Sequence, residues 1–119
     1  MSAKVLRSST QGKREIARIT TRDDAQPMKE VQSGTEIEVK DWVLQEVTNE
    51  RTGEVFQSIV IMNPNNQLFA TRSEFFIKKF FEIIDILADE EEPDDGPFII
   101  RVTKGKGRSG NEFTSCALA

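Results

Sequence analysis

The fold of this chain is narrowed down by the stretch from Gly34 to Ala70, which holds three β-rich runs in close succession. A glycine-bearing turn at Glu50 to Glu54 follows the first run, and a Pro-Asn-Asn turn follows the second. The second run, Val55 to Met62, is almost wholly apolar and should be a central strand. A helical pattern comes next, and then two further β-rich runs, Pro97 to Lys104 and Asn111 to Leu118. We therefore expect a mainly β fold, with five strands in the order of a small barrel and one helix between the third and fourth strands.

The first β-rich run, Thr35 to Thr48, should contain a sharp irregularity. Ile37 and Val39 alternate strictly with charged residues, as in a half-buried strand, but continuing the alternation would place Asp41 inside. A β-bulge or a sharp coil between Lys40 and Trp42 would restore the phase and bend the strand enough for it to join both sides of a barrel. A loop between two short strands is the alternative.

The helix is predicted to begin at Arg72 or Ser73, because Thr71 and Glu74 have the spacing of a capping box. Large apolar residues then recur at helical spacing, and polar residues fall on the opposite side. The apolar face is expected to plug the core, with a partner-binding face as the less common alternative. Its residues are Phe76, Ile77, Phe80, Phe81, Ile83, Ile84 and Leu87.

Residues 1 to 33 differ from the rest of the chain in composition. The first 22 residues hold six cations against Glu15 alone, and apolar residues are few. Such a segment cannot bury enough apolar surface to order itself, so we expect a basic, largely flexible arm over residues 1 to 33. Glu15 to Thr21 could add a short edge strand to it. Residues 34 to 119 are predicted to form the folded domain.

The formal net charge of −4 conceals a strong segregation of charge along the chain. Residues 82 to 95 contain eight acidic residues and no basic one, whereas residues 101 to 108 contain four basic residues and no acidic one. Net charge therefore does not exclude a nucleic-acid partner. Ala88 to Gly96 is expected to be a solvated loop, since it lacks the alternating pattern of a calcium-binding loop.

The catalytic inventory of the sequence is thin. There is no histidine and no tyrosine, and Cys116 is the single cysteine, so the usual general bases and zinc-ligand pairs are missing. We expect no enzymatic activity, no metal and no cofactor, with Cys116 as a small core residue. The absence of a disulfide pair, a signal segment and a membrane span predicts a cytoplasmic protein without a membrane partner.

Lys104 to Asn111 is the most informative short motif, because three glycines and three cations lie between two predicted strands. Such a loop can approach a phosphate chain closely and neutralise it, and a merely solvated hairpin loop is the alternative. Aromatic residues on strands could stack on bases. Phe69 should face outward if Leu68 and Ala70 face the core, while for Trp42 the core and the stacking alternatives both stay open. The predicted nucleic-acid-binding residues are Trp42, Arg51, Phe56, Phe69, Arg72, Arg101, Lys104, Lys106, Arg108 and Phe113.

The order of elements, the bent first strand with Trp42, the SIVIM sequence of the second strand and the basic glycine-rich loop resemble the single-stranded-DNA-binding proteins of bacteriophages and other mobile elements. The resemblance covers Gly34 to Leu118. It implies an OB-fold barrel that coats single-stranded DNA during replication or recombination, in the cytoplasm of a bacterial host cell if the protein is phage-encoded. It leaves open whether the protein forms a homo-oligomer or contacts replication or recombination proteins.

The acidic block motivates a different function. An OB-like protein-interaction module or inhibitor could use the acidic face from Glu82 to Asp95 to engage a basic protein or to imitate nucleic acid. Depletion of the protein by immobilised single-stranded DNA would separate the two functions.

Overall fold

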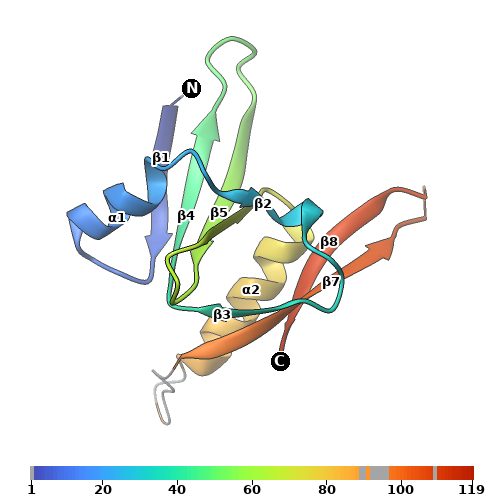
Figure 1. The fold of residues 1–119 in the computed structure, drawn as a ribbon. Helices are drawn as coiled ribbons and strands as arrows, with labels where there is room; N and C mark the ends of the chain where they lie inside the picture. Colours follow the sequence, from blue (N-terminus) through green and yellow to red (C-terminus); the bar gives the residue numbers. More distant parts are fainter. Residues whose placement is uncertain (1, 89–90, 92–96, 109) are drawn as a thin grey trace.

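The computed structural model describes residues 2–88, 91, 97–108 and 110–119, and within these residues the chain is mainly β, as predicted (Figure 1). The elements in chain order are β1 (Ser2–Ser8), α1 (Lys13–Thr20), β2 (Gln26–Pro27), a 3₁₀ turn η1 (Met28–Glu30), β3 (Glu36–Val39), β4 (Asp41–Thr48), β5 (Val55–Met62), β6 (Leu68–Thr71), α2 (Glu74–Leu87), β7 (Phe98–Lys106) and β8 (Glu112–Leu118). No helix in this part of the chain is long and apolar enough to cross a membrane.

The strands form two sheets instead of one closed barrel. The larger sheet has the order β1-β4-β5-β6-β2, with β5 in its centre as predicted, and the smaller sheet has the order β3-β7-β8. No ladder joins β6 to β8 in the described residues. A side-chain hydrogen bond links the two sheets at this point, because Ser73 Oγ, just after β6, donates to the carbonyl oxygen of Thr114 in β8 at 2.6 Å.

The predicted irregularity in the first run is confirmed at Lys40. This residue separates β3, which pairs with β7, from β4, which pairs with β5. Ile37 and Val39 before the break and Trp42 and Leu44 after it all belong to the main core. The chain thus changes sheets and shifts its inward phase at one residue, as the burial of Trp42 in place of Asp41 requires.

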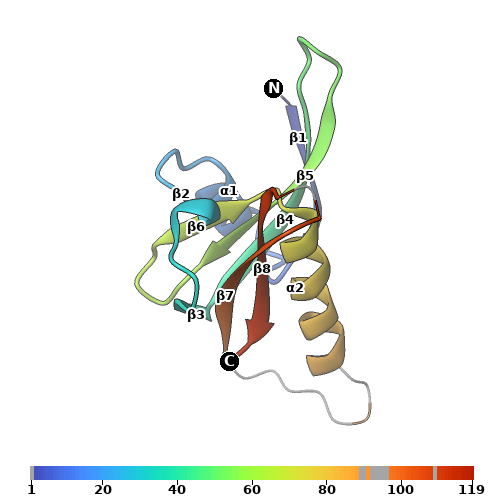
Figure 2. The same cartoon turned by 90° about the vertical axis from the view of Figure 1, so that its right-hand side faces the viewer.

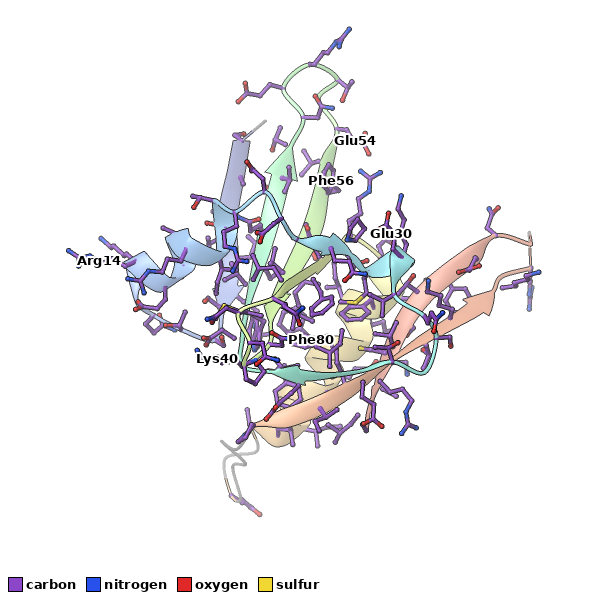
Figure 3. All side chains as sticks on the ribbon, viewed as in Figure 1. Arg14, Glu30, Lys40, Glu54, Phe56 and Phe80 are labelled. Atoms are coloured by element: carbon purple, nitrogen blue, oxygen red, sulfur yellow. The ribbon has the colours of Figure 1, made fainter. Side chains whose placement is uncertain are left out.

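α2 fills the space between the two sheets, so its predicted role as the plug of the core is confirmed. Phe76 and Phe80 are fully buried, and Phe80 lies in the middle of the molecule (Figure 3). The ring centroid of Phe80 is 5.7 Å from Trp42 on β4 and 6.2 Å from Phe98 on β7. One helix residue therefore contacts a strand of each sheet.

The predicted capping box at the start of this helix is wrong. The N-cap is Ser73, whose Oγ accepts from the backbone N–H of Phe76 at 3.4 Å. Thr71 remains extended because it pairs with Ile59 across β5 and β6, and its Oγ1 accepts from Ser73 N at 3.1 Å. Sheet pairing thus keeps Thr71 out of the helix.

Cys116 on β8 is buried in the main core, as predicted. Its Sγ donates to the backbone oxygen of Phe76 at 3.8 Å. Burial raises the pKa of the thiol to about 12, so the reactive thiolate is scarce at neutral pH.

Residues Ser2–Ser8, for which the sequence predicts a flexible arm, instead form β1 at the edge of the larger sheet. The strand pairs antiparallel with β4, and this ladder satisfies its backbone groups on one side. Arg7 also secures it: the guanidinium carbon lies 4.4 Å from the centroid of Phe81 and a nitrogen lies 3.5 Å from Asp85. Contacts with distant residues thus compensate for the small apolar content of the segment.

The edge strand predicted at Glu15 to Thr21 is wrong, because the segment is helical up to Thr20, within α1, and Thr21 is the C-cap. Ile19 packs with Val43, Val60 and Leu68 in a second apolar cluster, on the opposite face of the larger sheet from α2. The larger sheet is therefore covered on both faces over part of its area. The near-continuous apolar sequence of β5 follows from this, because Ile59 and Ile61 face one cluster while Val60 faces the other.

The segment from β2 to β3, most of which lies in the predicted flexible arm, spans the opening between the two sheets. β2 pairs parallel with β6. Further along, Gly34 N donates to the carbonyl oxygen of Val102 in β7 at 2.7 Å. Met28 and Val31 are buried in the main core between these two attachments.

Candidate nucleic-acid interface

Two hairpins project from the body of the protein in different directions (Figure 1), and each ends in a hydrogen-bonded turn. In the β4–β5 hairpin, Asn49 N donates to Glu54 O at 2.8 Å and Gly53 N donates to Asn49 O at 2.7 Å. In the β7–β8 hairpin, Gly107 N donates to Asn111 O at 2.9 Å. The predicted binding residues at the ends of these hairpins, Arg51, Lys106 and Arg108, are thus carried beyond the core.

Phe56 and Arg72, both predicted binding residues, contact each other. Phe56 is half-buried on β5, close to the β4–β5 turn (Figure 3), and the guanidinium carbon of the exposed Arg72 lies 4.9 Å from its ring centroid. Arg72 directly precedes Ser73, which is bonded to Thr114 near the base of the β7–β8 hairpin. The Phe56–Arg72 pair therefore connects the β4–β5 hairpin, near its turn, with the start of α2 beside β8.

An open hollow of about 500 Å³ adjoins this pair. Its charged lining consists of two acidic residues, Glu46 and Glu74, and two basic residues, Arg72 and Lys78. Because these charges balance, the hollow has no net attraction for phosphate, and its apolar lining of Val55, Phe56 and Ile77 suits a base.

The four predicted cations of β7 and its turn divide into two classes. Lys106 and Arg108 are exposed, and in the described part of the chain neither makes a salt bridge. Lys104 is largely buried: its Nζ donates to the backbone oxygen of Lys29 and lies 3.8 Å from Glu112. Arg101, in the middle of the strand, pairs with Glu36 at 2.9 Å. Two of the four cations are therefore engaged within the protein.

Arg51 is exposed in the turn of the β4–β5 hairpin. Its backbone N–H donates to Asn49 Oδ1 at 3.1 Å, and its neighbours in the turn include Glu50 and Glu54. This turn therefore offers one cation among two carboxylates.

Phe113, at the start of β8, does not present a free ring. A Cβ atom on Gly105 would lie 2.7 Å from its Cζ atom, so the ring lies directly against Gly105. The ring of Phe75 is 4.8 Å away between centroids, tilted by 36°. Sequence reasoning did not anticipate the contact with Phe75, although an isolated glycine within a strand is a signal that another group approaches closely.

Two further aromatic candidates are core residues. Trp42 is 7% exposed and its ring meets Phe80 and Phe81 edge-on, which favours the core alternative for this residue. The outward orientation predicted for Phe69 is wrong, because Phe69 packs against the main core. The prediction assumed that Leu68 faces the core. Leu68 is indeed buried, but it is buried in the cluster beneath α1, on the opposite face of the sheet from the main core.

In the described residues, no group of three or more His, Cys, Asp or Glu side chains is placed to hold a metal ion. No family model matches the chain, and the searches of curated proteins and of solved structures found no match. The function is therefore inferred from the geometry around Phe56, Arg72 and the two hairpins.

Proposed function

We propose that this protein binds single-stranded DNA and catalyses no reaction. The contact between Arg72 and Phe56, with 4.9 Å between the guanidinium carbon and the ring centroid, carries the proposal. Nucleic-acid bases stack on aromatic rings and on guanidinium planes, and each stacked base contributes about 1–3 kcal/mol. Because bases in a duplex are already stacked on their neighbours, this kind of contact favours unpaired bases.

The exposed cations suggest how the backbone would run. Lys106 and Arg108 on one hairpin and Arg51 on the other would contact phosphates, while the bases turn toward Phe56 and Arg72. The hollow supports this orientation because its two acidic and two basic residues balance in charge, whereas Lys106 and Arg108 carry positive charge without a salt bridge in the described residues.

The strand order supports an OB-like scaffold for this interface. The bent strand formed by β3 and β4 would be the first barrel strand, followed by β5, β6, α2, β7 and β8. In OB folds the turns after the first and fourth strands bind the ligand, and these correspond to the two projecting hairpins. The segment containing Met28 and Val31 would then close the barrel where β6 and β8 do not pair. A role in replication or recombination, in the cytoplasm of a bacterial host, is the setting that the resemblance suggests.

No observation favours the alternative of an acidic interaction module. In the described part of the acidic block, Glu82 pairs with Lys79 at 3.4 Å and Asp85 with Arg7 at 3.5 Å. The loop predicted over 88–96 lies almost entirely outside the described residues.

Fluorescence anisotropy with labelled oligo-dT, a duplex of equal length and oligo-rU tests the proposal. We expect the tightest binding to the single strands and an affinity that falls as salt rises, because phosphate contacts release counterions. Absence of binding at low salt, or equal affinity for the duplex, would contradict it. The ratio between oligo-dT and oligo-rU decides the preference for DNA over RNA.

A matched pair of variants connects this binding to the proposed surface. Arg72→Gln should weaken binding. Arg101→Gln removes the same charge from the smaller sheet, where Arg101 pairs with Glu36, and should leave the affinity nearly unchanged. Equal weakening in both variants would point to a general effect of charge and against a site at Phe56.

A further inference from the structure

The outer surface of α2 carries a row of four residues with the spacing of a helix–helix contact. Phe75, Lys79, Glu82 and Ile86 are separated by four, three and four positions, which places them on one line along the helix. Phe75 is 59% exposed and Ile86 is 74% exposed, the highest values for large apolar side chains in the described residues. Lys79 and Glu82 between them pair within the helix at 3.4 Å.

The row is separate from the proposed nucleic-acid surface. The α2 residues that line the hollow beside Phe56 are Glu74, Ile77 and Lys78. Glu74 and Ile77 point to other sides of the helix, and Lys78 lies on the flank of the row, four positions before Glu82. Next to the row runs β8, the edge strand of the smaller sheet, alongside α2 (Figure 2). The row thus occupies an open boundary between a helix and a sheet edge.

From this row we infer that α2 pairs with α2 of a second copy of this chain, in the antiparallel direction. The 4-3-4 spacing is the same from either end, so a two-fold axis between Lys79 and Glu82 places Phe75 opposite Ile86 of the second copy. The same axis places Lys79 opposite Glu82 of the second copy, and each apolar pair lies four residues, about 6 Å along the helix, beyond its charge pair. A self-complementary patch of this kind is what a two-fold dimer requires.

The central charges specify the direction of the pairing. In a parallel pair at the same register, Lys79 would face Lys79 and Glu82 would face Glu82, which is repulsive. In the antiparallel pair each cation meets a carboxylate, and four apolar side chains are removed from water at the two ends. Charges at such seam positions specify register and orientation at some cost in stability.

Sedimentation velocity of the full chain over a wide concentration range, without nucleic acid, tests the dimer. We expect a monomer–dimer equilibrium that shifts toward dimer as concentration rises. Ile86→Ser should shift it toward monomer without lowering the melting temperature measured at a concentration where both proteins are monomeric, because Ile86 is exposed in the monomer. A chain that is monomeric throughout, or a dimer that Ile86→Ser leaves intact, would overturn the inference.

Charge reversal provides the decisive measurement. Lys79→Glu alone and Glu82→Lys alone should each raise the dimer Kd by about ten-fold or more, because like charges then face each other twice. Mixing the two variants should restore association, since every facing pair in the mixed dimer is again opposite in charge. Lys13→Glu, the same charge change at an exposed position of α1 on the opposite face of the larger sheet, should leave the Kd unchanged. Failure of the mixture to associate would rule out this pairing, and it would do so whether or not the protein binds DNA.

Discussion

The two projecting hairpins differ in what their strands and turns present. The β4–β5 hairpin has an accessible aromatic residue near its turn, Phe56, beneath the guanidinium of Arg72, but the turn itself is mainly acidic. The β7–β8 hairpin has exposed cations at its end, whereas its aromatic residue, Phe113, is enclosed between Gly105 and Phe75. Stacking and charge are thus divided between two arms that one core supports.

This division explains how a chain of net charge −4 could bind a polyanion. Charge neutralisation is concentrated where Lys106 and Arg108 project from the body, and the stacking group lies where acidic and basic residues balance. The two contributions should therefore respond differently to salt and to substitution.

The largest effect is expected from Phe80→Ala, because Phe80 contacts β4 and β7, the strands that lead into both hairpins. Truncation of a fully buried phenylalanine should lower the free energy of unfolding by about 3–5 kcal/mol, measured by urea denaturation. Ile86→Ala on the exposed side of the same helix is the control and should change little at a protein concentration where the chain is monomeric. A decrease below about 1 kcal/mol for Phe80→Ala would contradict the role of Phe80 as a support shared by both hairpins.

Phe56→Ala should weaken binding to oligo-dT by about 1–3 kcal/mol while leaving the salt dependence of the affinity nearly unchanged, because stacking releases no counterions. Phe113→Ala is the matched change on the other hairpin. Since its ring is packed on both sides, it should lower the melting temperature, and the folded fraction should bind normally. The reverse pattern would transfer the stacking role to the β7–β8 hairpin.

Lys106→Gln with Arg108→Gln should reduce the slope of log affinity against log salt by up to about 1.4, or about 0.7 for each phosphate of a single strand that the protein no longer neutralises. Near 0.1 M salt this corresponds to an affinity that is weaker by about ten-fold or more. Arg51→Gln should change the slope by at most about half as much, since it removes one cation.

Lys104→Gln is the control for this comparison, because its ammonium is bonded to Lys29 O within the protein. It should lower the melting temperature and preserve the slope. A full change in slope would mean that Lys104 leaves its internal partner and binds a phosphate.

The smallest effect concerns the turns. Gly53 has φ of +75°, a left-handed conformation, whereas Gly107 lies outside that region and has room for a methyl group. Gly53→Ala should therefore destabilise the protein by about 1–2 kcal/mol, and Gly107→Ala should be nearly neutral by thermal denaturation. Equal effects would show that the left-handed turn of the β4–β5 hairpin imposes no special constraint.

Local patterns in the sequence were sufficient to predict the strands after residue 34, the break at Lys40 and the buried face of α2. Each of these depends on spacing within a few residues: period two in a strand, period 3.6 in a helix, and the turn preferences of glycine, proline and asparagine. Among the candidate site residues, Phe56 and Arg72 were each predicted, but their contact was not, since 16 positions separate them in the chain.

Long-range packing determined the rest. α1 covers the second face of the larger sheet, so Leu68 is buried away from the main core and Phe69 points into it. Lys104 has the same charge as Lys106, yet its hydrogen-bond partner is the backbone oxygen of Lys29. β1 is held by its ladder with β4 and by Arg7 above the ring of Phe81. Alternation states that two neighbours lie on opposite faces, but which face is covered, and by what, depends on residues far away in the chain.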